Sequence, residues 1–263
     1  MRLRREFGAR VLLGRGEREG LQWLHQVRTD VPLTSLRELV SAGESALAER
    51  IRHYARAQDA FDPSSWEEPD GWLEAGLVDL GGRRLRVIPT PGHTRGHVVF
   101  LDEAERLLFA GDHVLPHITP SIGFELADRG LPLADFLDSL DLLLRYPDAR
   151  LLPAHGDAGG GSHRRVAELL AHYADRLDDC RAVVEVSGGA TAGEVARRLV
   201  WTGRRRRFSD LDDFNQMLAG LRDRRPPRRA GAPAGPASVG GVRRRGRRTA
   251  HRRAGGLHLC PVT

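Results

Sequence analysis

Three short segments of this 263-residue chain share a pattern in which an apolar run ends at a glycine or proline turn that carries a metal-binding side chain. The segments read RVIPTPGH, LLFAGD and ARLLPAH, and they place His93, Asp112 and His155 after predicted strands. Side chains in such turns can converge at one edge of a sheet without disturbing the core. Two imidazoles and a carboxylate are a normal zinc ligand set, so the pattern predicts a metal site.

Three further histidines lie close to these turns. His97 begins the strand predicted after His93, and we expect it to orient the turn by hydrogen bonding rather than to bind metal. His113 and His117 lie next to and just beyond Asp112. Each is open to two interpretations, a side chain that lines a substrate cleft or a partly buried neutral imidazole. The second interpretation is preferred for His117.

Hydrophobic periodicity predicts a mixed α/β chain with hairpins rather than a regular βαβ series. Strands are expected at residues 9–13, 77–80, 85–88, 97–101, 107–110 and 151–152. Helices are expected at residues 15–27, 132–146 and 163–184, and one long helix or a helix pair at residues 34–57. A capping box at Thr191–Glu194 predicts a further helix that either enters a nucleic-acid groove or, as we prefer, packs against its own domain or a partner.

Composition favours a cytoplasmic protein with no membrane segment. The two cysteines, Cys180 and Cys260, are far apart in the sequence, which suggests neither a disulfide framework nor a cysteine-type zinc site. No apolar run approaches the roughly 18 residues that a membrane span requires. The apolar run at Val11–Leu13 is too short for the core of a signal peptide.

The net charge of +6 is unevenly distributed along the chain. Residues 222–263 hold 12 arginines and one acid, Asp223, so the preceding residues carry a net charge of −5. This Arg/Pro/Gly-rich tail lacks the residues needed for a packed core, and we expect it to be disordered. Its arginines would allow it to bind nucleic acid through phosphates. The preferred interpretation is a frameshift or readthrough product, because the composition changes abruptly after FSDLDDFNQMLAGL.

The segments PGHTRGHVVF, FAGDHVL and LLPAHGD resemble the third, fourth and fifth motifs of the metallo-β-lactamase superfamily. The resemblance covers residues 1–160 and implies an αββα sandwich, here N-terminally truncated, in a zinc-dependent hydrolase. Residues 161–221 resemble the helical, winged-helix-like C-terminal extension of hydrolases of the β-lactamase-like protein 2 type. The tail, residues 222–263, would follow as a third region.

The resemblance also implies roles for the three predicted ligands. His93 would bind a first zinc ion, His155 a second, and Asp112 would bridge both ions as the catalytic carboxylate. A hydroxide between two zinc ions would then attack an ester, a thioester or a phosphodiester. Residues 113–129 are expected to line the cleft, with Ile122 and Phe124 as apolar walls.

One motif of the superfamily is absent from this sequence. The first metal motif, HxHxDH, does not occur, and His25 and His53 stand alone on predicted helices. Three hypotheses follow: an active zinc hydrolase whose true start lies upstream of Met1, a fragment with little metal and no turnover, or a nucleic-acid-binding module that uses the winged-helix-like region and the tail. The expected partner is a small-molecule ester or thioester, or RNA, and catalysis by this chain is expected to be weak or absent.

Overall fold

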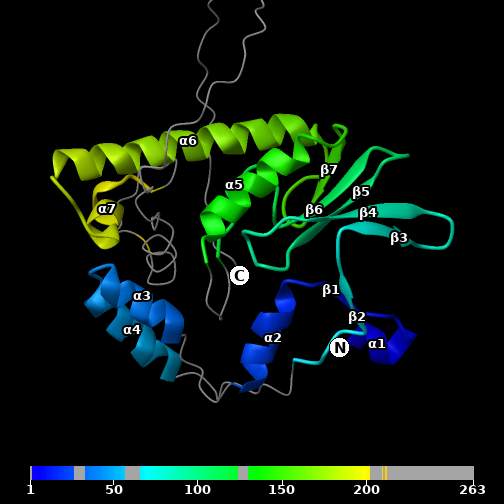
Figure 1. Ribbon diagram of the computed structural model, residues 1–263, viewed down its shortest axis with the longest axis horizontal. Coiled ribbons are helices and arrows are strands. Elements are labelled where there is room, and N and C mark those ends of the chain that lie inside the picture. The colour runs from blue at the N-terminus through cyan, green and yellow to red at the C-terminus, as the bar shows by residue number, and fades with distance from the viewer. Residues whose placement is uncertain are drawn as a thin grey trace, which may run out of the picture.

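The computed structural model describes residues 2–26, 33–56, 66–123 and 130–201, together with residues 209 and 211. Within these ranges the chain forms helices and two sheets, which confirms the predicted mixed α/β class (Figure 1). The strands are β1 (Leu12–Gly14), β2 (Gly71–Leu73), β3 (Gly76–Asp79), β4 (Arg84–Pro89), β5 (Val98–Asp102), β6 (Leu107–Gly111) and β7 (Arg150–Pro153). The helices are α1 (Arg2–Phe7), α2 (Glu17–Gln26), α3 (Leu33–Ser41), α4 (Ser45–Arg56), α5 (Pro132–Leu143), α6 (Ser162–Val186) and α7 (Ala192–Arg198).

The larger sheet has five strands in the order β3-β4-β5-β6-β7. Strands β3 to β6 pair with their neighbours antiparallel, whereas β6 and β7 are parallel. The parallel pair is joined through α5, as a crossover connection requires. Strands β4, β6 and β7 therefore run in the same direction, and their carboxyl ends lie at one edge of the sheet. A separate two-stranded sheet pairs β1 with β2 in parallel.

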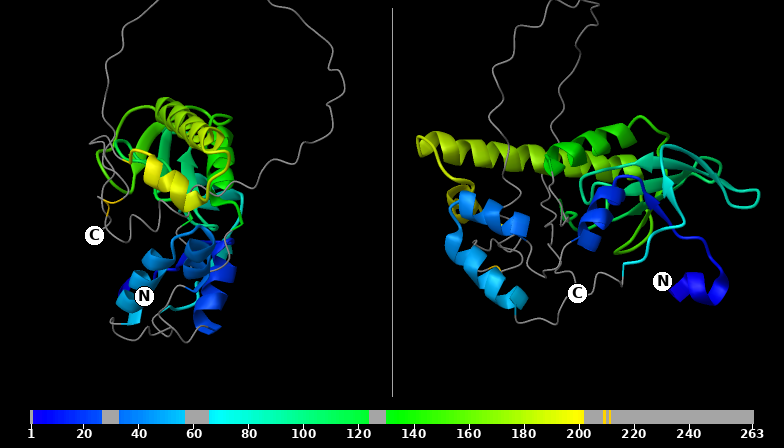
Figure 2. Two further views of the ribbon diagram at one scale, coloured as in Figure 1. Left: turned by 90° about the vertical axis from the view of Figure 1, so that its left-hand side faces the viewer. Right: turned by 60° about the horizontal axis from the view of Figure 1, so that its bottom comes forward.

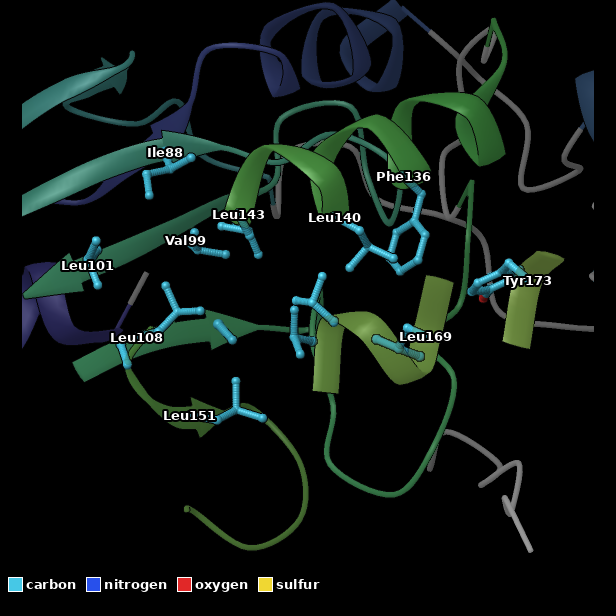
Figure 3. Close-up of a cluster of buried hydrophobic side chains, with 14 of the residues drawn as sticks. Ile88, Val99, Leu101, Leu108, Phe136, Leu140, Leu143, Leu151, Leu169 and Tyr173 are labelled. Carbon is cyan, nitrogen blue, oxygen red and sulfur yellow. The ribbon is translucent and has the colours of Figure 1, made fainter. Parts of the chain in front are cut away.

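Helices α5 and α6 cover one face of the five-stranded sheet and enclose the main core (Figure 3). Alternate residues of the strands, including Val99, Leu101 and Leu108, meet Phe136 and Leu140 of α5 in this cluster. The apolar positions of α5 repeat at helical spacing, and for that reason one stripe of the helix is buried. Burying each such side chain contributes about 1.5–3 kcal/mol.

A second apolar cluster lies at the far end of α6, where α3 and α4 pack against α7 (Figure 2). Its buried members include Leu39 and Leu47 from the α3–α4 hairpin and Val195 from α7. Helix α7 begins at the predicted capping box, in which Thr191 and Glu194 exchange hydrogen bonds. Because the apolar face of α7 is buried here, the helix packs within its own chain, as preferred from the sequence.

The boundary between the two apolar clusters does not coincide with residue 160, the predicted end of the first domain. Residues 36–51 precede the five-stranded sheet in sequence, yet they pack with residues 195–201. Cys180 and Val183 of α6 also contact this second cluster, while the first half of α6 lies in the main core. No helix in the described ranges combines the length and the apolar composition needed to cross a membrane.

Candidate metal centre

The direction of the strands brings the three predicted ligands together. His93 follows β4, Asp112 follows β6 and His155 follows β7, so all three lie at the same edge of the sheet. The backbone N–H of Ala154 donates to the carbonyl of Gly111 at 3.0 Å, which holds the ends of β6 and β7 side by side. The topology thus supplies the convergence that the three sequence segments predict.

Asp112 lies between the two imidazoles. His155 Nε2 is 3.2 Å from Asp112 Oδ1, and His93 Nε2 is 4.0 Å from Asp112 Oδ2. The two oxygens therefore face different histidines. Side-chain exposure rises from 19% at His93 through 34% at Asp112 to 63% at His155, so the site opens to solvent on the His155 side.

A backbone carbonyl orients the His93 ring. His93 Nδ1 lies 2.8 Å from the carbonyl oxygen of Ser121. A carbonyl oxygen only accepts hydrogen bonds, so Nδ1 carries a proton, and in the neutral ring Nε2 keeps its lone pair. Such a contact to the second ring nitrogen commonly fixes the tautomer of a metal-binding histidine. The lone pair of Nε2 is thereby directed to the side on which Asp112 lies.

His97 has both ring nitrogens engaged in hydrogen bonds. Its Nε2 accepts the backbone N–H of Asp112 at 3.2 Å, and its Nδ1 lies 2.8 Å from Thr90 Oγ1. Burial, followed by the neighbouring His93, lowers the pKa of His97 to about 4, so the ring is neutral at pH 7. These contacts confirm the prediction that His97 orients the turn by hydrogen bonding, and they leave neither nitrogen free for a metal ion.

Gly111 has the conformation that this contact needs. Its φ of 52° lies in the left-handed region, and a Cβ atom there would stand 2.7 Å from His97 Nε2. Glycine has no Cβ, so the chain can turn sharply after β6 while the His97 ring lies against it. The glycine of the FAGD segment therefore positions both His97 and the backbone N–H of Asp112.

The structure decides the open interpretation of His113 and contradicts the preferred interpretation of His117. His113 is buried against Phe136, with ring centroids 4.7 Å apart, because the turn after β6 directs it into the core. Burial, with the neighbouring His97 and His93, lowers the pKa of His113 well below its usual value. His117, for which burial was preferred, is exposed. The expected cleft wall at Ile122 was wrong, since Ile122 belongs to the main core, and Phe124 lies outside the described residues.

The donor chemistry fits zinc in kind, although the described part of the chain holds no group of three or more His, Cys, Asp or Glu residues placed to hold an ion. Two atoms bound tetrahedrally to one zinc ion lie about 3.4 Å apart. The separation of His155 Nε2 and Asp112 Oδ1 matches this value, whereas that of His93 Nε2 and Asp112 Oδ2 is wider. A catalytic zinc commonly takes three protein ligands, so three side chains fall short of a two-ion centre.

Two supporting residues were not predicted from the sequence. Thr90 lies directly before the turn that carries His93, and its position between the strand and the PGH segment is a signal that sequence reasoning can use. Ser121 acts through its carbonyl oxygen. Every residue type carries that group, so no sequence signal marks the position.

The fold and the site together define the class of this protein. It is a mixed α/β protein that carries histidine and aspartate at the carboxyl ends of three aligned strands. The model of the metallo-beta-lactamase superfamily matches residues 22–155, about half of the chain. The chain therefore belongs to this superfamily. The predicted family and fold class are confirmed, whereas the likeness of residues 161–221 to a winged-helix extension stays a prediction.

Similar proteins come from bacteria and fungi. A metallo-beta-lactamase family protein from Thermus thermophilus has 31% sequence identity and a TM-score of 0.59, over 81% of this chain and 65% of that one. The lactamase-like protein nscB of Neosartorya fischeri is 30% identical over 53% of this chain and 44% of its own. An atrochrysone carboxyl ACP thioesterase of Aspergillus aculeatus is 29% identical over 51% of this chain and 41% of its own. The chain spans less than half the length of these curated relatives.

Proposed function

We propose that this chain carries the metal site of a zinc-dependent hydrolase that cleaves thioesters. The observation that carries the proposal is the position of Asp112, whose two carboxylate oxygens face the Nε2 atoms of His93 and His155. A carboxylate with one oxygen toward each imidazole would allow all three side chains to act as zinc ligands. Membership of the metallo-beta-lactamase superfamily supports the same chemistry.

In this proposal His93, Asp112 and His155 would hold the zinc. The bound zinc would supply an acidified water as nucleophile and would polarise the carbonyl under attack. The chain's own residues prepare the site: Ser121 fixes the His93 tautomer, and His97 holds the backbone of Asp112. Since three side-chain donors meet here among the residues that the structure describes, fewer than a two-ion centre needs, we expect weak zinc binding and slow turnover.

The substrate class rests on the relatives. Fungal proteins similar to this chain are named ACP thioesterases, which favours a thioester over the phosphodiester or β-lactam that the superfamily otherwise suggests. The exposure of His155 agrees with a substrate that is presented from a larger carrier, because that side of the site is open. The alternative of nucleic-acid binding through residues 222–263 stays a prediction, because the tail lies outside the described residues.

The test measures zinc binding and thioester hydrolysis by the purified full chain. An N-acetylcysteamine thioester, a phosphodiester and a β-lactam are compared as substrates, with and without added zinc. Asp112→Ala and His155→Ala are expected to abolish zinc-dependent turnover, whereas His53→Ala, an exposed histidine on α4, leaves it unchanged. Zinc-dependent cleavage of the phosphodiester alone would overturn the thioester assignment. Equal activity in Asp112→Ala would overturn the metal site.

A further inference from the structure

Arg165 of α6 is a buried cation that binds two backbone carbonyls. Its side chain is only 7% exposed. Nε donates to the carbonyl of Leu115 at 2.6 Å, and Nη2 donates to the carbonyl of Ile118 at 3.0 Å. Nη1 pairs with Glu168 at 3.1 Å. The guanidinium thus holds two points of one loop and compensates its own burial with hydrogen bonds.

The loop that Arg165 holds runs from Asp112 to Gly123, and both ends of it touch the metal site. It starts at the predicted bridging aspartate. Near its far end the carbonyl of Ser121 accepts the hydrogen bond from His93 Nδ1 at 2.8 Å, and the N–H of Gly123 donates to the carbonyl of Gly92 at 2.8 Å. Displacing the middle of the loop would therefore move the group that fixes the His93 tautomer.

We propose that Arg165 is a positioning residue for His93. By holding the carbonyls of Leu115 and Ile118, it keeps the Ser121 carbonyl at His93 Nδ1, so that His93 presents the lone pair of Nε2 to the metal site. The proposal rests on the proposed function only in treating His93 as a ligand. It extends the site beyond the superfamily match, which ends at residue 155, into α6.

The geometry requires arginine at this position. The planar guanidinium carries its donors in a fixed fork, and two of them reach carbonyls three residues apart. The ammonium group of a lysine donates from a single nitrogen on a shorter side chain and lacks this fork, so we expect it to hold the two carbonyls less well. Without an arginine or a lysine at this position, two buried carbonyls lose their hydrogen-bond donors. We then expect the loop to shift until these carbonyls can accept hydrogen bonds from water.

The neighbouring Arg164 provides a matched control. It lies on the same helix, is 78% exposed and approaches the same Glu168, at 4.0 Å. Arg164→Met and Arg165→Met therefore remove the same charge from the same helix, but only the second removes the carbonyl contacts. Glu168→Gln separates the two kinds of contact further, because it removes the ion pair of Arg165 and leaves both carbonyl bonds in place.

The primary experiment reads the tautomer of His93 in the metal-free full chain. Long-range ¹H–¹⁵N spectra of the histidine rings are recorded at about pH 8, where imidazoles in general are neutral. His93→Asn assigns the signal. We expect a pure Nδ1–H tautomer in the wild type, Arg164→Met and Glu168→Gln, and a mixed tautomer in Arg165→Met. Zinc affinity, measured by competition with a chelating dye, is expected to fall about 10- to 100-fold in Arg165→Met alone.

The outcomes separate this proposal from the proposed function. An unchanged His93 tautomer in folded Arg165→Met overturns the positioning role, whether or not the protein is a hydrolase. A tautomer that follows Arg165 in a chain without thioesterase activity supports the positioning role and contradicts the function. If Arg165→Met does not fold, Arg165→Lys takes its place. An intermediate tautomer mixture there supports the proposal, and a wild-type spectrum overturns it.

Discussion

The contact between His97 and Asp112 shows how a residue outside the predicted ligand set can position one that belongs to it. Thr90 is fully buried, and its hydroxyl lies 2.8 Å from His97 Nδ1, while Nε2 of the same ring accepts the Asp112 N–H. Because the backbone N–H of Asp112 can only donate, Nε2 is unprotonated, and Nδ1 carries the proton and donates to the Thr90 hydroxyl, which supports this choice of tautomer. The backbone of Asp112 depends on that choice, because only an unprotonated Nε2 can accept its N–H.

Replacing Thr90 by valine tests this chain of contacts. Valine keeps the shape of the side chain but leaves the Nδ1–H of His97 without an acceptor in the core. We expect the free energy of unfolding to fall by about 1–3 kcal/mol and zinc affinity to fall about 10-fold or more. Urea denaturation and a zinc titration measure the two effects. Wild-type zinc affinity in a folded Thr90→Val chain would show that Asp112 does not need this support.

Two glycines with positive φ allow the effect of backbone strain on stability to be measured separately from the effect of the contact with His97. Gly111→Ala places a Cβ 2.7 Å from His97 Nε2, whereas Gly81→Ala, at φ 76°, meets no atom within 4 Å. Both substitutions carry the strain of a left-handed alanine, about 1–2 kcal/mol. We expect the Gly111 variant to lose clearly more stability than the Gly81 variant in urea denaturation. Equal losses would mean that the His97 ring simply moves aside.

The sequence predicts part of this site and misses the rest for a physical reason. His93, Asp112 and His155 each follow a strand in a turn of glycine or proline, which is a local pattern. Ser121 and Arg165 support the site through contacts with residues far away in the chain. The direction of His113 stayed open because one residue after a turn can point either way, and only the packing of α5 decides its direction.

At the scale of elements, α6 begins at a carboxylate that lies outside the helix. Asp148 Oδ1 accepts the backbone N–H of His163 at 3.0 Å and the hydroxyl of Ser162 at 3.1 Å. A Cβ on the N-cap residue Gly161 would stand 2.9 Å from Asp148 Oδ2, which favours glycine there. Asp148 thus acts as a side-chain cap from the preceding loop.

Substituting Asp148 is expected to weaken α6 in a pH-dependent way. The hydrogen bond from the His163 backbone, with that from Ser162, lowers the pKa of Asp148. The contribution of Asp148 to the free energy of unfolding is therefore complete above its pKa in the unfolded state, about 4 as for aspartates in general. It is lost as the pH falls through the lower pKa of the folded state. Asp148→Ala should cost about 1 kcal/mol near pH 7. Urea midpoints of variant and wild type should approach each other as the pH falls through the lowered pKa of Asp148; a constant difference would contradict this account.

Most elements of the described chain could be predicted, because their apolar periodicity is local. The strands of the five-stranded sheet and helices α5 and α6 lie close to the ranges expected from the sequence. Strand β2 was missed, since its three residues qualify as a strand only through pairing with β1, far earlier in the chain. Helix α1 was also missed; Arg4 is held there by Glu67 and Asp70, contacts that its own sequence does not reveal.

At the scale of the whole molecule, α6 belongs to both apolar clusters. Its first half places Val166, Leu169 and Tyr173 in the main core, and its second half contacts the cluster of α3, α4 and α7. The region up to residue 160, predicted from the sequence as a domain, lacks these side chains. The packing therefore argues that the α/β region and the helical extension fold together.

Truncation tests this dependence. A chain that ends at residue 160 loses three large core side chains, about 1.5–3 kcal/mol each. That sum is comparable with the total stability of a typical domain, about 5–15 kcal/mol. We expect no cooperative thermal transition by near-UV circular dichroism, whereas a chain that ends at residue 221 keeps one. A sharp transition in the shorter chain would establish residues 1–160 as an independent folding unit.

The parallel pairing of β6 with β7 also determines when the metal site forms during folding. Asp112 and His155 become neighbours only after β7 has paired with β6, and this pairing closes the long connection that contains α5. Such long-range pairings are slow to form, because loop closure precedes the contacts that reward it. During refolding, a cobalt probe should therefore develop its colour with the last kinetic phase, and the ion would report a finished fold instead of guiding an early one.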